Sequence, residues 1–123
     1  MYSFSNITTL QADLKGGKIT CAALVEQALL AITEKKHLNA FLETFEASAK
    51  EAAKRTDEKI KYGTAGKLAG VIIGLKDNIC YKDHKVSASS KILEGFESLY
   101  SATVVERLLA EDAIIIGRTN CDE

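Results

Sequence analysis

Apolar side chains recur with a helical period in the first third of the chain. Ile7, Leu10 and Leu14 are spaced as one face of a helix, and two glycines at 16 and 17 supply a C-terminal stop. Thr20 can cap a second helix. The apolar stripe of that helix consists of Leu24, Val25, Ala28, Leu29 and Ile32. The pattern therefore predicts two amphipathic helices in succession.

A third helix is predicted from about Glu46 to Lys61. Its inner face carries mostly small residues: Ala49, Ala52, Ala53, Thr56 and Ile60. Small side chains bury little apolar area, so we expect a covering layer rather than a core element. The stretch 40–44 before it fits either a strand or an extended connector.

The pattern changes after Gly63. Residues 68–75 and 113–117 are apolar at both odd and even positions and rich in β-branched residues, which is typical of strands covered on both faces. A short helix ending at Ala110 separates them, with Ser101 or Thr103 as its cap. Thr103 and Glu106 also have the spacing of a capping box. Strand, helix and strand in this order predict a parallel β/α unit.

These elements give an α/β fold class with an N-terminal helical layer (1–62) followed by a strand-helix-strand unit (66–118). The two strands are expected to be the first of a mixed, largely parallel sheet that is incomplete as given, because both faces and both edges need further cover. We therefore interpret residues 1–123 as the N-terminal part of a single domain whose remainder is absent.

Composition narrows the class of protein. The chain has 123 residues, 46% hydrophobic and 27% charged, with a net charge of −1, so it carries no general attraction for nucleic acid. Three scattered cysteines argue for a reducing cytoplasm and against a zinc site. The two histidines, His37 and His84, are expected at the surface. No secretory signal, membrane span or metal site is predicted.

Lys76 is the candidate for chemistry. It ends the apolar run and is followed by Asp77 and Asn78, and the ends of parallel strands are where α/β proteins usually place functional groups. A lysine stem against apolar walls leaves the ammonium group partly desolvated, which favours the neutral amine. A neutral amine can take a proton from a serine hydroxyl. The alternative is an ordinary charge that marks the exit of the strand into solvent.

Other polar groups give weaker signals. The serines at 87, 89 and 90 have no nucleophile elbow around them, so a polar loop with local side-chain-to-backbone bonds explains them as well. The glycines between 63 and 74 match no phosphate-binding pattern. The carboxylate pairs Glu111-Asp112 and Asp122-Glu123 are expected to face water.

The segment around Lys76 resembles a known family. Residues 66–79 (GKLAGVIIGLKDNI) are similar to the lysine motif of the amidase-signature family. Further similar segments are 88–94 (ASSKILE), 101–108 (SATVVERL) and 115–120 (IIGRTN) with Asp122-Glu123. The resemblance covers most of the chain and is densest from 66 to 123. Family members usually have proline where this chain has Ile72, a difference that leaves the strand interpretation intact.

The resemblance implies a Ser–cis-Ser–Lys triad, in which the lysine relays a proton through a bridging serine to the nucleophilic serine. Lys76 matches the lysine. Neither serine has a counterpart in this chain, because the family's Gly/Ser-rich signature follows the segment that ends here. The same holds for the family's oxyanion donors and substrate-binding residues. We therefore expect the 123-residue chain alone to be inactive.

Residues 38–43 (LNAFLE) resemble one branch in particular, the glutaminase (A) subunits of glutamyl-tRNA(Gln) amidotransferases. For that branch the resemblance implies glutamine as substrate, subunits B and C as partners, and tRNA bound mainly through a partner. It implies no cofactor in the glutaminase subunit itself, while the intact complex uses ATP and Mg. Two alternatives remain: another amidase-signature carboxamide hydrolase, and a non-catalytic interaction module in which Lys76 is structural.

Overall fold

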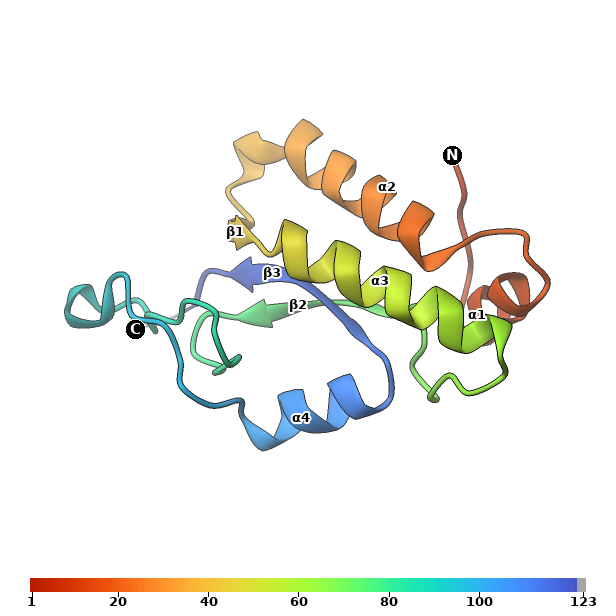
Figure 1. Cartoon of the computed structure of the whole chain (residues 1–123). Helices are drawn as coiled ribbons and strands as arrows, with labels where there is room; N and C mark the ends of the chain where they lie inside the picture. Colours follow the sequence, from red (N-terminus) through yellow and green to blue (C-terminus); the bar gives the residue numbers. More distant parts are fainter. Residues whose placement is uncertain (122–123) are drawn as a thin grey trace.

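A computed structural model describes residues 1–121, which form four α-helices and one three-stranded sheet (Figure 1). In chain order the elements are α1 (Ile7–Lys15), α2 (Cys21–Glu34), β1 (Phe41–Thr44), α3 (Glu46–Lys61), β2 (Ile72–Lys76), α4 (Thr103–Ala110) and β3 (Ile114–Thr119), with short 3-10 helices at Lys36–Leu38 and Lys91–Leu93. Asp122 and Glu123, expected to face water, lie outside the described residues. None of the helices within 1–121 is long and apolar enough to cross a bilayer.

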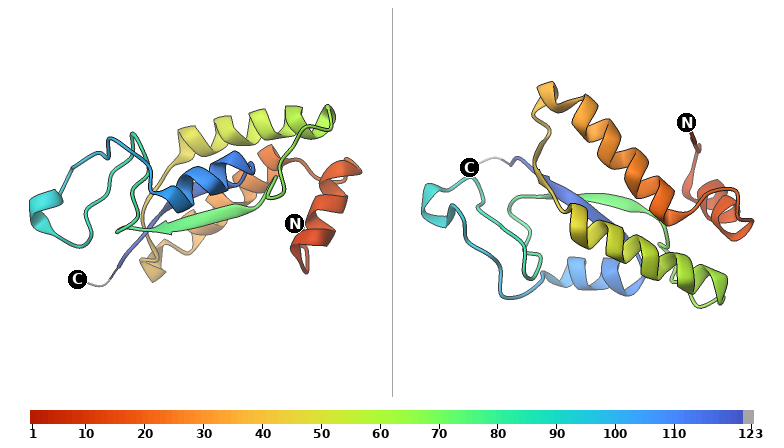
Figure 2. Two further views of the ribbon diagram at one scale, coloured as in Figure 1. Left: turned by 90° about the horizontal axis from the view of Figure 1, so that it is seen from below. Right: turned by 45° about the horizontal axis from the view of Figure 1, so that its top comes forward.

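The α/β class and the parallel strand pair are confirmed. The strand order is β1-β3-β2, with β2 parallel and β1 antiparallel to β3. The stretch 40–44, for which a strand and a connector were both open, therefore supplies a strand at one edge of the described sheet. Along β3, Ile114 and Ile116 pack into a core with α1, α2 and α3, whereas Ile115 packs with Val105 of α4. Helices thus cover both faces of β3 (Figure 2).

The first helix has the predicted C-terminal stop but a different apolar face. Leu10 and Leu14 are buried, whereas Ile7 is 45% exposed, so its assignment to the inner face is wrong. The first turn is capped by Asn6, whose side-chain oxygen accepts a hydrogen bond from the Thr9 amide at 2.8 Å. The helix ends at Lys15 with Gly16 as its C-cap, at the predicted stop.

The N-terminus of α2 has two caps from different parts of the chain. Thr20 accepts a hydrogen bond from the Ala23 amide at 3.1 Å, which confirms the predicted cap. Asp57 of α3 adds a second, because its carboxylate accepts from the Cys21 and Ala22 amides at 2.7 and 3.1 Å. A carboxylate is favourable at this positive end of a helix, so the contact fixes α3 against α2.

The third helix was expected as a covering layer, and this expectation is wrong. Its bounds agree with the prediction, but Ala49 and Ala53 are 1% and 0% exposed and belong to the main core. The helix packs against both α2 and β3. Small side chains let its backbone approach both neighbours closely, so the inner face of the helix is part of the core although each alanine buries little area.

The strand that ends at Lys76 is shorter than predicted. It begins at Ile72, and residues 67–70 form a turn instead. The turn is closed by the Val71 amide, which donates to the Leu68 carbonyl at 3.0 Å, and Gly70 has a positive φ of 81°. A left-handed backbone at this position opposes a regular strand. The strand is also less covered than predicted, since Gly74 is exposed.

The expectation that Glu111 and Asp112 face water is also wrong. Asp112 accepts from the Gly66 amide at 2.7 Å and from the Lys59 ammonium group at 2.8 Å. Glu111 accepts from the Lys67 amide at 2.7 Å. The two carboxylates therefore hold the turn that leads into β2.

The predicted cap of α4 is wrong as well. The helix begins at Thr103, and the N-cap residue Ala102 has no side chain that can accept a hydrogen bond. The Ser101 hydroxyl accepts instead from the Lys82 amide at 3.0 Å, in the long segment between β2 and α4. A tertiary contact has replaced the local cap.

Cys21 is expected to resist alkylation until the chain unfolds. Its thiol is 0% exposed, and burial, with the nearby Asp57 carboxylate, raises its pKa to about 12. Compared with a pKa of 9.0, the reactive thiolate is about a thousandfold scarcer at pH 8. Mass spectrometry after iodoacetamide treatment should show modification at the partly exposed Cys80 and Cys121 in the native chain, and at Cys21 only in denaturant. Equal labelling of all three in buffer would contradict this packing.

Candidate functional site

Lys76 lies at the carboxyl end of the parallel strand pair. It is the last residue of β2 and is paired with Thr119 of β3. The segment 77–101 projects beyond this edge of the sheet (Figure 1). Within residues 1–121 the Lys76 side chain is exposed, so the expected apolar walls are not formed by this part of the chain.

The backbone on either side of Lys76 is held by hydrogen bonds. The Lys76 carbonyl accepts from the Ile79 amide at 3.0 Å, closing a turn immediately after the strand. The Asp77 amide donates to the Thr119 carbonyl at 2.9 Å, and the Asp77 carbonyl accepts from the Ala88 amide at 3.0 Å. The turn that follows Lys76 is therefore tied to β3 on one side and to the projecting segment on the other.

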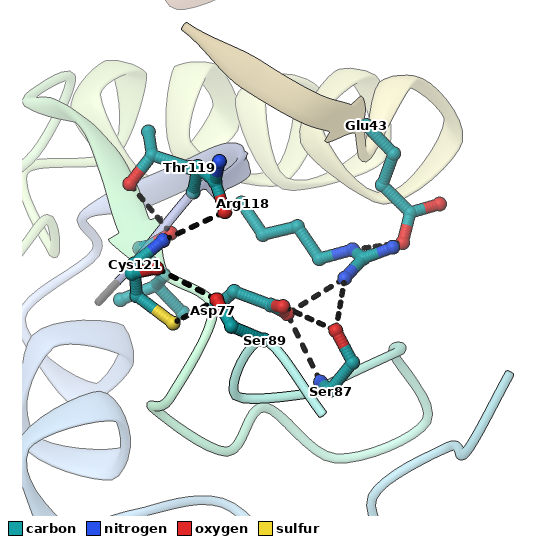
Figure 3. A network of polar contacts seen from close by, with 9 residues as sticks. Glu43, Asp77, Ser87, Ser89, Arg118, Thr119 and Cys121 are labelled. Carbon is teal, nitrogen blue, oxygen red and sulfur yellow. Dashed lines mark hydrogen bonds and ion pairs between the residues drawn. The ribbon is translucent and has the colours of Figure 1, made fainter. Parts of the chain in front are cut away.

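The Asp77 side chain is the centre of a buried polar network (Figure 3). Its carboxylate accepts from the Ser87 amide at 3.1 Å, from the Ser87 hydroxyl, and from Arg118 Nη1 at 2.6 Å. Arg118 Nε donates to Glu43 at 2.7 Å. We refer to Glu43, Asp77, Ser87 and Arg118 as the Asp77 network. It connects β1, β3, the turn after β2 and the projecting segment.

The charges in this network stabilise one another. The Asp77 side chain is fully buried, and burial alone raises the pKa of a carboxyl group. The hydrogen bonds from Ser87 and the guanidinium of Arg118 outweigh burial, so the net pKa of Asp77 is lowered. For Arg118, burial lowers the pKa, but its bonds to Asp77 and Glu43 raise it overall. Both groups are therefore charged at neutral pH.

The serine cluster makes long-range rather than local bonds, so the polar-loop interpretation is wrong for two of the three. Ser87 bonds the Asp77 carboxylate, and Ser89 donates to the Cys121 carbonyl at 2.6 Å. Ser90 has a local bond between backbone groups, from its amide to the Ser87 carbonyl at 2.8 Å, which does not test the prediction for its side chain. These hydroxyls brace the projecting segment against the ends of the strands.

Of the two histidines, His37 is exposed as expected, but His84 is packed. Its Nε2 lies 2.9 Å from the Ser48 hydroxyl and its Nδ1 2.7 Å from the Lys82 carbonyl. The ring stacks on Tyr81 with centroids 3.8 Å apart. His84 thus fastens the projecting segment to α3. Across residues 1–121, no three His, Cys, Asp or Glu side chains come together as a metal site.

Sequence reasoning singled out Lys76 but not the Asp77 network beside it. Asp77 could have been noticed because it directly follows the lysine, and Arg118 because a charge directly follows an apolar strand. Neither position indicates that the two side chains meet, since they are 41 residues apart. Their pairing depends on the parallel register of β2 and β3.

Known proteins align with this chain over most of its length. It is 42% identical over 121 residues to the A subunit of the glutamyl-tRNA(Gln) amidotransferase of Chlorobaculum parvum and 43% identical over 121 residues to that of Brachyspira hyodysenteriae. These alignments cover 98% and 95% of this chain but 25% of each relative. The chain therefore spans about a quarter of the length of these curated relatives.

Solved structures agree with the fold. The peptide amidase from Stenotrophomonas maltophilia superimposes with a TM-score of 0.89 at 30% identity, over 97% of this chain and 25% of the amidase. The sequence model of the family described as Amidase matches residues 23–123. Lys76, the network beside it and the parallel strand pair all lie within that match, and the chain belongs to the Amidase, or amidase-signature, family.

Proposed function

We propose that this chain is part of the glutaminase subunit of a glutamyl-tRNA(Gln) amidotransferase and that Lys76 is the lysine of its Ser–cis-Ser–Lys triad. In this proposal the enzyme hydrolyses the side-chain amide of glutamine. The ammonia passes to the B subunit, which uses ATP and Mg to amidate glutamyl-tRNA(Gln), and the small C subunit braces the pair. We assign neither serine of the triad to residues 1–121; in this proposal another part of the enzyme supplies them.

The placement of Lys76 carries the proposal. Its amine is exposed at the carboxyl edge of a parallel strand pair, on a backbone fixed by hydrogen bonds before and after it. An amine in this position is open to groups brought by another part of the polypeptide. Such a segment would cover the amine, supply the missing apolar wall and place a serine hydroxyl within reach, which favours proton transfer from serine to lysine.

A second candidate is the hydrolysis of a different carboxamide. The fold matches that of a peptide amidase at 30% identity with a TM-score of 0.89, so the framework around Lys76 is equally suited to other amides. The substrate is chosen by groups that bind its non-reacting part, and residues 1–121 supply none that we can assign.

Amide specificity in a chimaera tests the proposal. This chain replaces the matching quarter of the C. parvum glutaminase subunit, expressed with that organism's subunits B and C. We expect ammonia release from glutamine, with little from asparagine or a peptide amide, and loss of that release in Lys76→Ala. A Lys54→Ala chimaera is the matched control, because Lys54 is an exposed lysine on α3 outside the site. Full activity in Lys76→Ala would contradict the assignment of Lys76 as the lysine of the triad.

A further inference from the structure

We propose that Arg118 is a positioning residue for Lys76. In this role the guanidinium holds Asp77, and through it the turn that orients the lysine toward the missing serines. The inference rests on the proposed function, because it assigns a role in that same site. It goes further by naming an arginine on a different strand that touches neither the substrate nor the reacting atoms.

Arg118 is placed to hold three elements at once. Its Nη1 bonds the Asp77 carboxylate at 2.6 Å and its Nε bonds Glu43 at 2.7 Å, so the two sides of one guanidinium face the turn after β2 and the edge strand β1 (Figure 3). The approach of β1 depends on Gly117, where a Cβ would lie 2.5 Å from the Glu43 carbonyl oxygen. The planar fork of arginine suits this bridge, which a lysine can make only in part.

Asp77 passes the restraint to Lys76 through the backbone. The two residues are adjacent, and the Asp77 amide and carbonyl are both bonded, to Thr119 and Ala88 respectively. The carboxylate adds the bonds to Ser87 and Arg118, so main chain and side chain of Asp77 are fixed together. The peptide that joins Lys76 to Asp77 therefore has little freedom to rotate.

Lys76 itself has no such restraint on its side chain. Its long stem is exposed within residues 1–121, and no hydrogen bond or ion pair of its ammonium group is seen there. For proton transfer the amine must reach one hydroxyl at hydrogen-bond distance, and a displacement of about 1 Å can cost a hundredfold in rate. The fixed point in this arrangement is the backbone at residues 76–77, so what holds Asp77 sets where the amine can go.

A purely structural role for the same ion pair predicts a different result. Loss of stability lowers the amount of folded enzyme but leaves the turnover of each folded molecule unchanged. Loss of positioning lowers kcat per folded molecule and leaves KM nearly constant, because no group that binds substrate is altered. The two roles therefore separate in kcat and KM measured on the folded fraction.

The test uses the chimaera described above with Arg118→Met, Arg118→Lys, Ser87→Ala and Arg55→Met, assayed on whichever amide the parent chimaera hydrolyses. Arg55 is the matched control, since its ion pair with Glu51 is long, at 3.8 Å, and largely exposed. We expect kcat per folded molecule to fall about 100-fold in Arg118→Met with KM within about twofold, and to recover in part in Arg118→Lys. Ser87→Ala should lower kcat by a smaller factor, and Arg55→Met should resemble the parent.

The outcomes separate this inference from the proposed function. Unchanged kcat in folded Arg118→Met, or a rise in KM alone, would overturn the positioning role. Should Arg118→Met fail to fold, Arg118→Lys decides, because a lysine can make the bridge between Asp77 and Glu43 only in part. A kcat equal to that of the parent in folded Arg118→Lys would then overturn the positioning role. If Lys76→Ala is fully active, the proposed role of Lys76 fails, and the inference about Arg118 fails with it. If Lys76→Ala is inactive but Arg118→Met is unaffected, only the inference about Arg118 fails.

Discussion

Lys76→Arg is expected to lower the kcat of the chimaera by about 10²- to 10⁴-fold, nearly as much as Lys76→Ala. Both lysine and arginine carry a positive charge, but a guanidinium is not deprotonated at working pH and cannot accept a proton. If Lys76 acts as a base, charge alone does not restore turnover. The measurement is steady-state ammonia release from glutamine by Lys76→Arg, Lys76→Ala and the parent.

The comparison between Lys76→Arg and Lys76→Ala distinguishes a proton acceptor from a fixed positive charge. Lys54→Arg on the exposed face of α3 is the control for expression and assembly, and should match the parent. If Lys76→Arg retained most of the activity lost in Lys76→Ala, the side chain would be acting as a fixed positive charge. Proton transfer to Lys76 would then have to be abandoned, even though the residue is essential.

In the 123-residue chain, Arg118→Met is expected to lower the free energy of unfolding by about 3–5 kcal/mol. The substitution leaves the Asp77 carboxylate buried and, within residues 1–121, with Ser87 as its one remaining side-chain partner. An uncompensated buried charge is costly, and the loss is a large fraction of the stability of an ordinary domain. Urea unfolding followed by circular dichroism gives the difference. Arg55→Met should change it by less than about 0.5 kcal/mol, and equal losses in both variants would contradict a special role for the buried pair.

The same ion pair predicts an acid limit to stability. The pKa of Asp77 is lowered in the folded chain, so its contribution is fully present above its ordinary value of 3.8 and is lost as pH falls through the folded value. The urea midpoint of the parent should therefore fall steeply below about pH 4. Asp77→Asn should be less stable at pH 7, and its urea midpoint should fall less as the pH drops below about 4. An identical fall of the midpoint in both proteins would mean that other carboxylates control the acid sensitivity.

The sequence was most informative where local pattern and tertiary packing agree. Local pattern predicted the stop of α1, the cap of α2 and both bounds of α3, and the apolar run 113–117 predicted the strand that proves central, because these patterns reflect burial along a single element. The lysine at the end of β2 could also be located in this way, since an apolar run that stops at a charge marks the edge of a sheet. These features depend on neighbours in sequence alone.

The wrong predictions for Ser101, Glu111 and Asp112 have a common cause. Ser101, expected as a helix cap, bonds the Lys82 amide, and Glu111 and Asp112, expected in water, hold the turn at residues 66–67. In each case a polar side chain has a local partner or solvent available but bonds a backbone group that is distant in sequence. Local propensity cannot rank these options, because the competing partner is present only once the chain has folded.

For this protein, sequence by itself determined the class of fold, the order of the helices, both bounds of α3, the strand at 113–117 and the position of Lys76 at the end of a strand. Tertiary structure alone decided that the alanine-rich α3 lies in the core, that residues 67–70 turn rather than extend, and that Arg118 reaches Asp77 across 41 positions. The physical reason is that periodicity records which side of an element is buried, whereas the register of parallel strands determines which buried charges meet.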